Sequence, residues 1–303
     1  MTRVVRAATR GSALARWQTD HVASLLRASH GDGVVVEVVV VQTEGDRRQD
    51  VSLDQIGGRG VFVKEVQAAV VDGRADIAVH SAKDLPSAPS LQPEGLVIAA
   101  VPKRGDPRDA MVGCALADLP PGALVATGSV RRRAQLAYAR PDLTFADLRG
   151  NIGTRLDKAS QFDAIVVALA ALERLGRTDA VAEVLSPSVL LPQVAQGALA
   201  VECRADDAGT IELLRAIEHG PSRRAVDAER AFLATLGGGC DLPVGALAEV
   251  ASDGVTIAMT ALLATFDGRS VVRATRDGTD PAALGAEMAS YLLDGCGGRS
   301  FVA

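Results

Sequence analysis

The first two thirds of the chain alternate between short apolar runs and stretches with helical spacing. The runs that predict strands cover residues 34–41, 77–79, 96–101 and 164–167. Apolar residues at helical spacing over 61–71, stopped by Gly73, predict a helix between the first two of these strands. Strands and helices that alternate in this way are typical of an α/β fold.

Two segments share a local pattern of a strand, a turn of small residues and a helix. The sequence "ATRGS" at 8–12 precedes one such helix, and "ATGS" at 126–129 precedes another that ends near Pro141. The free N–H groups of a helix N-terminus bind anions. We therefore predict two similar α/β domains that each direct a helix N-terminus into a shared cleft. Ordinary capping by Ser12 and Ser129 explains the same pattern.

The last third of the chain predicts a small β-β-β-α domain. Its strands and helix cover residues 246–250, 255–264, 270–276 and 281–293. Asp253-Gly254 and Asp267-Gly268 have the composition of hairpin turns. A helix over about 222–236 precedes this domain, and Gly237 stands where its C-terminal cap belongs. Cys240 therefore lies on a loop between that helix and the first strand.

Composition excludes several classes of protein. The chain has 303 residues and a net charge of -5, and only 3% of its residues are aromatic. These values argue against a nucleic-acid or anionic-membrane binder. The longest uncharged apolar run, 164–172, is too short to span a bilayer. Four arginines among the first 16 residues leave no apolar signal core, so we expect a cytoplasmic protein with reduced thiols.

The four cysteines and four histidines predict no metal site. The cysteines are widely spaced, no CxxC occurs, and no two histidines form an HxxxH pair. Cys240 stands in "LGGGCDLPVG" without a partner base that would identify a cysteine hydrolase. The neighbouring Asp241 does not favour a thiolate. We therefore interpret Cys240 as a permanent attachment point.

Arginines gather around predicted turns. Three of them, 131–133, open the helix after Ser129, and Arg149 and Arg155 flank the glycines of "LRGNIGTR". Surface arginines are usually only solvated, but three at a helix N-terminus oppose the helix dipole, and a bound anion would offset that cost. Together with "RGS" at 10–12, this set predicts a cleft for a polyanion.

Two further loops carry candidate residues. "HSAKDLP" follows a buried strand, where α/β sheets place functional loops, and offers Lys83 and Asp84. Asp84 could instead serve only as a turn residue, and His80 as a core histidine. The glycine-rich "IGGRGVFVKE" at 56–65 is neither a P-loop nor a dinucleotide-binding motif. It is either a lid with Phe62 near its hinge or a plain connection.

These segments together resemble the porphobilinogen deaminase (hydroxymethylbilane synthase) family along essentially the whole chain. The matching segments, in order, are "ATRGSALARWQ", "GGRGVFVKE", "ADIAVHSAKDLP", "RGDPRDA", "TGSVRRRAQL", "LRGNIGTRLDK", "FDAIVVALAALERLG", "LPQVAQGALAVECR" and "LGGGCDLPVG". The resemblance implies a transferase of tetrapyrrole and haem biosynthesis. Such an enzyme condenses four porphobilinogen molecules head to tail, with release of ammonia, into the linear tetrapyrrole hydroxymethylbilane.

The resemblance also implies a cofactor and a set of site residues. The family's dipyrromethane cofactor, linked through a thioether to a loop cysteine, matches Cys240, and the catalytic carboxylate matches Asp84. Cofactor-binding groups match Lys83, Asp84, Thr127, Ser129, Arg131, Arg132 and Arg149. Substrate-binding groups match Arg10, Ser12, Arg149, Arg155 and Arg174. Phe62 matches the lid, and neither a metal nor a nucleic-acid or membrane partner is implied.

The fold implied has two α/β lobes like those of periplasmic binding proteins, plus a small C-terminal α+β domain with a three-stranded antiparallel sheet. Domain 1 is expected over 1–99 and 196–214, domain 2 over 100–195, and domain 3, which carries the cofactor cysteine, over 215–303. The family suggests a monomer. A non-catalytic two-lobed protein that binds a carboxylate ligand is the alternative, because a fold alone does not define a function.

Three positions depart from the family's common pattern. Arg59 stands where lysine is common, which keeps the charge and changes the donor geometry. "ATGSVRRR" replaces the more usual "GTSSLRRQ", so Gly128 lacks a hydroxyl group and Arg133 adds a charge. The missing hydroxyl removes one potential hydrogen bond to the cofactor or substrate.

Overall fold

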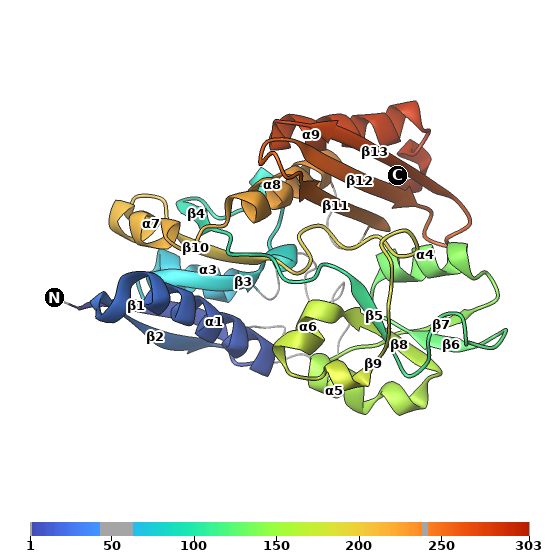
Figure 1. Cartoon of the computed structure of the whole chain (residues 1–303), viewed down its shortest axis with the longest axis horizontal. Coiled ribbons are helices and arrows are strands. Elements are labelled where there is room, and N and C mark those ends of the chain that lie inside the picture. The colour runs from blue at the N-terminus through green and yellow to red at the C-terminus, as the bar shows by residue number, and fades with distance from the viewer. Residues whose placement is uncertain (1, 43–62, 238–241, 303) are drawn as a thin grey trace. The chain divides into compact units, whose positions relative to one another are not determined.

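The computed structural model describes residues 2–42, 63–237 and 242–302 (Figure 1). The chain divides into two compact units. Unit 1 comprises Met1–Arg104 and Ala198–Arg223, and unit 2 comprises Gly105–Gly197 and Arg224–Ala303. The division into three domains stays a prediction.

Unit 1 is built on a five-stranded mixed sheet with the strand order β2-β1-β3-β10-β4 (Figure 1). Its strands are β1 (Arg3–Arg10), β2 (Val34–Val41), β3 (Ile77–Ser81), β4 (Leu96–Ala100) and β10 (Leu199–Arg204). Strand β1 runs parallel to β2 and β3, whereas β10 runs antiparallel to β3 and β4. The predicted strand 34–41 is confirmed at both ends.

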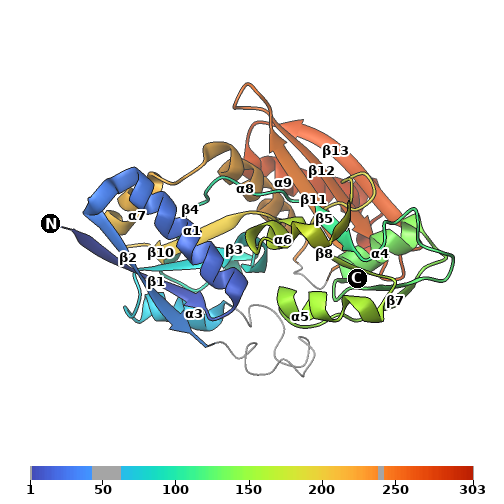
Figure 2. The same cartoon turned by 60° about the horizontal axis from the view of Figure 1, so that its bottom comes forward.

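Helices cover both faces of this sheet, because successive strand residues point to opposite sides. The helices are α1 (Ala13–His30), α3 (Lys64–Val71) and α7 (Ala208–Arg215). Ala7 packs in one core cluster with residues of α1 and α7, and the adjacent Ala8 packs in another with residues of α3. Figure 2 shows α1 lying along its face of the sheet.

Unit 2 contains a second five-stranded sheet with the order β7-β6-β8-β5-β9. Its strands are β5 (Asp109–Val112), β6 (Leu124–Ala126), β7 (Thr144–Ala146), β8 (Ala164–Ala168) and β9 (Val181–Val184). Strand β6 is parallel to β7 and β8, and β5 is antiparallel to β8 and β9. The two sheets therefore have the same topology, with β6 in the place of β1 and β8 in the place of β3.

Three helices complete the second sheet, namely α4 (Val130–Ala139), α5 (Ile152–Asp157) and α6 (Leu169–Arg174). Leu136 of α4 belongs to the core cluster on one face, whereas Ile152 of α5 and Leu172 of α6 belong to the cluster on the other. The predicted repeat of strand, small-residue turn and helix is confirmed as β1 followed by α1 and β6 followed by α4.

The C-terminal part of unit 2 is an antiparallel sheet with the order β11-β12-β13. Its elements are β11 (Val244–Val250), β12 (Ile257–Ala264), β13 (Val271–Gly278), α9 (Pro281–Ser290) and α10 (Arg299–Val302), preceded by α8 (Gly220–Thr235). Gly254 and Gly268 both have φ +71°, as the predicted hairpin turns require, and Gly237 has φ +68° just beyond α8. The predicted fold class, two α/β sheets with helices plus a small α+β part, is confirmed.

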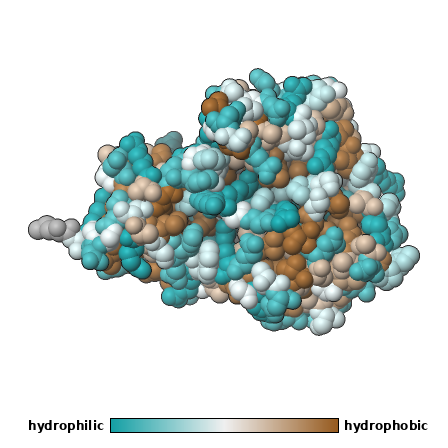
Figure 3. Space-filling view, in the orientation of Figure 1, coloured by the Kyte–Doolittle hydropathy of each residue, from teal (hydrophilic) through white to brown (hydrophobic). Residues whose placement is uncertain are grey.

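Several helices and strands begin or end two or three residues away from their predicted limits. Strand β3 continues to Ser81, because the backbone there pairs with Leu199 of β10. The last long helix ends at Ser290, and a wider π turn, Tyr291–Gly295, follows it. No helix in the described ranges is long and apolar enough to cross a membrane, and hydrophilic residues cover much of the face shown in Figure 3.

Candidate functional site

In unit 1, the predicted residues gather where the parallel strands β1 and β3 end. Ala8 pairs with Ala78, so the carboxyl ends of the two strands lie at the same edge of the sheet. Arg10 is the last residue of β1, and Ser12 caps α1 by accepting a hydrogen bond from the Ala15 amide at 3.3 Å. The edge where β1 and β3 end therefore carries both a cation and a helix N-terminus.

Asp84 closes a short 3₁₀ turn, Ala82–Asp84, directly after β3. The turn is held by its neighbours, because the Ala82 amide donates to the Ala198 carbonyl at 3.0 Å and Leu85 is buried. Asp84 itself is exposed, and its carboxylate has no hydrogen-bond or ion-pair partner in the part of the chain that the structure describes. A mere turn residue would use this carboxylate on the local backbone, so the geometry favours a role toward a ligand.

His80 and Ser81, which precede this turn, belong to the support of the sheet. His80 is buried, and its Nε2 lies 3.1 Å from Oε2 of Glu202. Gln67 of α3 donates to the same carboxylate at 2.9 and 3.2 Å, and Gln18 of α1 donates to the Ser81 hydroxyl at 2.8 Å. These contacts agree with the interpretation of His80 as a core histidine.

In unit 2, the predicted residues follow the three parallel strands β6, β7 and β8. Thr127 and Ser129 come after β6, Arg149 and Arg155 after β7, and Arg174 at the end of α6 after β8. Because these strands are parallel, their carboxyl ends meet at one edge of the sheet, the usual place for a ligand in α/β proteins. The predicted cleft shared by the two sheets stays a prediction.

Small side chains shape the beginning of α4. The Ser129 hydroxyl accepts a hydrogen bond from the Arg132 amide at 3.4 Å, and the Thr127 hydroxyl accepts one from the Ser129 amide at 3.3 Å. Ser129 therefore caps α4, as the simpler explanation of the sequence pattern predicted. A hydroxyl that caps a helix still has a second lone pair and a proton for a ligand.

The arginines of this edge differ in what they contact. Arg149 is half-buried, and its guanidinium has no hydrogen-bond or ion-pair partner among residues 63–237 or the other described ranges. Arg155 donates to the Gly150 carbonyl at 2.8 Å. Arg174 donates to the Gly197 carbonyl at 2.5 Å. Burial lowers the pKa of Arg174 to about 10, although the nearby negative charge of Glu173 acts to raise it. Arg149 is thus the best placed to receive an external carboxylate.

Arg131 and Arg132 do not point outward as the sequence pattern suggested. They are only 2% and 5% exposed, and both bind the fully buried carboxylate of Asp109. Arg131 Nη2 lies 2.7 Å from Oδ2, and Arg132 contacts Oδ1 through Nε at 3.0 Å and Nη2 at 2.7 Å. Asp109, and not only a bound anion, offsets their charge.

Asp109 is a residue that the sequence analysis missed. Burial would raise the pKa of its carboxyl, but the charges of Arg131 and Arg132 and a hydrogen bond from Gln196 hold that pKa well below its usual value. The signal in the sequence was an aspartate at the first position of an apolar strand, where a charge needs a buried partner.

A small cavity in unit 2 lies between α4, α8 and the start of β11. Residues from α4, α8, the 193–194 segment and β11 line it, namely Ser129, Arg131, Gln193, Val194, Leu233, Leu242 and Val244. Leu242 is two residues after Cys240 in the sequence. Cys240 itself, like Phe62 and Arg59, lies outside the described residues.

The other cysteines are less suited to carry a group. Cys203 is fully buried, and burial raises its pKa to about 11, which disfavours the thiolate. Cys114 and Cys296 are free and half-buried. No group of three or more His, Cys, Asp or Glu residues within the described ranges could hold a metal ion.

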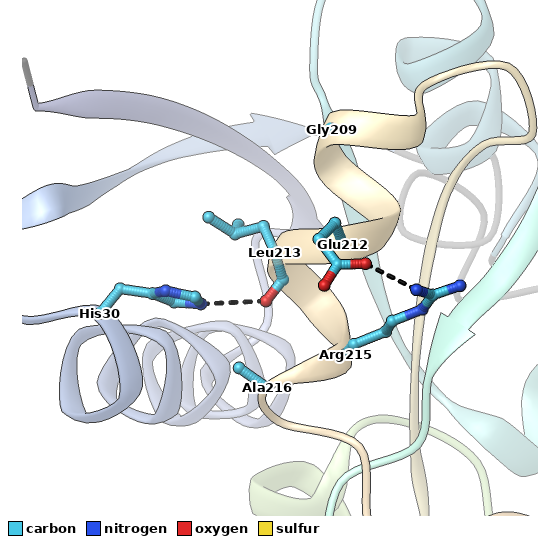
Figure 4. Close-up of a pocket in the computed structure, with 6 residues that line it drawn as sticks. All are labelled: His30, Gly209, Glu212, Leu213, Arg215 and Ala216. Atoms are coloured by element: carbon cyan, nitrogen blue, oxygen red, sulfur yellow. Dashed lines mark hydrogen bonds and ion pairs between the residues drawn. The ribbon is translucent and has the colours of Figure 1, made fainter.

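An open pocket in unit 1 is separate from these residues (Figure 4). His30 Nε2 donates a hydrogen bond to the Leu213 carbonyl at 3.0 Å, and Arg215 pairs with Glu212 at 2.6 Å. These polar groups already contact protein atoms, and none of the predicted residues lines the pocket. It offers no second candidate for the site.

The fold and these residues define a class of protein: an α/β protein with two sheets of equal topology, each carrying basic and hydroxyl side chains where its parallel strands end. Two family models match the chain, "Porphobilinogen deaminase, dipyromethane cofactor binding domain" over residues 5–212 and "Porphobilinogen deaminase, C-terminal domain" over 224–294. The chain belongs to the porphobilinogen deaminase family.

Individual relatives agree with the family models. The porphobilinogen deaminase of Nitratidesulfovibrio vulgaris is 47% identical over 302 residues, covering 96% of this chain and 94% of that protein. The porphobilinogen deaminase of Roseiflexus sp. is also 47% identical, covering 97% of each chain. The solved methionine binding protein MetQ aligns with a TM-score of 0.40 and 12% identity over 71% of this chain and 89% of that one, a similarity too low to carry an argument.

Proposed function

We propose that this protein is a hydroxymethylbilane synthase, a transferase that deaminates porphobilinogen and joins four molecules head to tail. Membership of the family supports this function and not the non-catalytic binding protein. The structural observation that carries the proposal is Asp84, an exposed carboxylate without a partner in the described ranges, held at the edge of a sheet beside basic residues. Formation of hydroxymethylbilane from porphobilinogen by the purified protein tests it directly.

The cofactor is dipyrromethane, which supplies the primer onto which the pyrrole units are condensed. We infer that Cys240 carries it through a thioether. Lys83, Asp84, Thr127, Ser129, Arg131, Arg132 and Arg149 would hold its carboxylates and pyrrole nitrogens. The match of residues 5–212 to the family's dipyromethane cofactor binding domain supports the assignment of the groups that hold it.

The substrate's acetate and propionate groups explain the remaining basic residues. We infer that Arg10, Ser12, Arg149, Arg155 and Arg174 bind them, since guanidinium groups bind carboxylates bidentately. Arg149 has no partner in the described chain that it would have to give up. Arg174 lies at the end of α6, and one of its hydrogen bonds, to the Gly197 carbonyl, fixes the guanidinium in place.

Asp84 is the proposed catalytic residue. When the amine leaves porphobilinogen, the remaining methylene-pyrrole is positively charged, and a fixed carboxylate near the pyrrole N–H stabilises that charge. When protonated, the same group can give its proton to the departing amine, and the carboxylate that results can accept the proton lost when the new carbon–carbon bond forms. A turn held by backbone hydrogen bonds keeps the carboxylate in place for both steps.

The attachment of the cofactor to Cys240 is tested by the mass of the intact protein. We expect the wild-type mass to exceed the sequence mass by two porphobilinogen units less two ammonia molecules. Cys240→Ser is expected to lose the whole excess and the activity. Cys114→Ser and Cys296→Ser, which change free half-buried thiols, are expected to keep it. An active wild-type protein of unmodified mass would contradict the assignment.

Other properties follow from the family and remain proposals. We infer that the protein acts as a monomer in the cytoplasm, without a nucleic-acid, membrane or metal partner. Movement of the two α/β parts about their connections, with Phe62 on a lid, would admit the lengthening product.

A further inference from the structure

In this chain, the turn that carries Arg149 approaches Gly128, the residue before the N-cap of α4, too closely to leave room for a side chain. A Cβ atom on Gly128 would lie 2.7 Å from the carbonyl oxygen of Leu148 and 3.6 Å from Nη1 of Arg149. The first distance is inside van der Waals contact, so the two backbones approach this closely only because Gly128 has no side chain. The Arg149 side chain consequently lies over the turn that begins α4.

Neither side of this contact can move freely to admit a side chain. Leu148 is 1% exposed and packs in the core with Ile165 and Leu172. On the other side, Arg132 lies in the first turn of α4 and is bound to the buried Asp109. Displacement of either backbone would disturb a close-packed core or a buried ion cluster.

A surface ion pair holds the same turn from outside. Arg133 Nη2 lies 3.0 Å from Oδ1 of Asp147, two residues before Arg149, and the two side chains are 40% and 69% exposed. The Thr127 amide also donates to the Ala146 carbonyl at 2.9 Å, which joins the two turns. Gly128 and Arg133, the two departures from the family's usual "GTSSLRRQ", therefore contact one and the same turn.

We propose that Gly128 and Arg133 act together as positioning residues that set where Arg149 presents its guanidinium to a pyrrole carboxylate. The inference rests on the proposed function, because it takes the ligand to be a porphobilinogen-derived carboxylate. It requires no hydrogen bond from Gly128. The usual pattern has a hydroxyl group at this position. In this chain, the absence of a side chain at Gly128 lets the Leu148 backbone approach, and the ion pair from Arg133 holds Asp147 against α4.

The first test is Gly128→Ser in cofactor-loaded protein. Displacement of one charged contact that is made equally in the ground and transition states is expected to raise KM for porphobilinogen about 10-fold and to leave kcat within about twofold. Gly33→Ser is the matched control, because a Cβ there would meet nothing within 4 Å. A folded Gly128→Ser protein with wild-type KM would overturn the inference.

The exposed end of the turn gives a test that does not depend on the folding of Gly128→Ser. Arg133→Gln and Asp147→Asn are each expected to raise KM roughly twofold, and the double variant no further than either alone. If the two substitutions raised KM additively, or if neither raised it, the role of Arg133 would be overturned.

A crystal structure of Gly128→Ser separates this inference from the proposed function. We expect the Leu148 carbonyl and the Arg149 side chain to be displaced from α4, whatever the enzyme's activity. An unmoved turn would refute the positioning role. A wild-type protein without porphobilinogen turnover would refute the proposed function. The crystal structure of Gly128→Ser would still show whether Gly128 positions Arg149.

Discussion

Replacement of Asp84 by asparagine is expected to reduce the turnover of porphobilinogen by about 10³-fold. The amide keeps the shape of the side chain but removes the negative charge that stabilises the methylene-pyrrole cation, and it accepts no proton. Because Asp84 has no partner within the described residues whose loss would disturb the fold, the variant is expected to fold normally. The measurement is the rate of hydroxymethylbilane formation by protein whose mass shows the attached cofactor.

The control for this variant is Asp72→Asn, an exposed carboxylate in the same unit that pairs with Arg74 at 3.2 Å. It is expected to have wild-type turnover. Turnover of Asp84→Asn close to that of wild type would remove Asp84 from the mechanism. Loss of the cofactor mass from Asp84→Asn would indicate a role in assembly of the cofactor and not in the repeated condensation.

Replacement of Asp109 by asparagine is expected to lower the free energy of unfolding by about 3–5 kcal/mol. The substitution leaves Arg131 and Arg132 buried against a neutral amide, so that two desolvated charges lose their counter-ion. Gln196 also loses a carboxylate acceptor, at 2.9 Å in the wild type. Urea denaturation of the two proteins measures the difference.

The pH dependence of this difference has a definite sign. The pKa of Asp109 is depressed in the folded state, so its contribution is fully present above the pKa of an unfolded aspartate, about 3.9. It is lost only as the pH falls through the lower folded value. The stability difference between wild type and Asp109→Asn is therefore expected to be constant from about pH 8 to about pH 5.

Asp142→Asn provides the surface counterpart, because Asp142 forms a similar two-point pair with Arg140 at 2.7 and 2.8 Å but lies at the surface. Its effect is expected to be much smaller, since exposed pairs are screened by water. Equal effects of the two variants would show that burial of the Asp109 cluster does not determine its contribution.

For the arginines at 131–133, the sequence predicted their position on the helix but not their partners. The three arginines at 131–133 were expected to share one role toward an anion, because the pattern placed them together at a helix N-terminus. The structure separates them: two turn inward to Asp109, and Arg133 pairs with Asp147. Spacing along a helix predicts which residues are neighbours, but the partner of each charge comes from another strand or turn.

The sequence by itself determined what depends on neighbouring residues. Apolar periodicity predicted the strands and helices, and the glycines at 237, 254 and 268 predicted the helix end and hairpin turns, because a left-handed φ is a local requirement. The family motifs likewise led to the predictions for Asp84 and Cys240, which stay predictions. These inferences needed no contact between distant parts of the chain.

Only the tertiary structure decided the long-range pairings. Strand β10 enters the first sheet between β3 and β4, although it follows them by about a hundred residues, and β5 takes the equivalent place in the second sheet. Asp109 faces Arg131 and Arg132, and Gly128 faces Leu148, for the same reason. Burial of charge and close approach of backbones depend on which surfaces meet in three dimensions, and no local pattern contains that information.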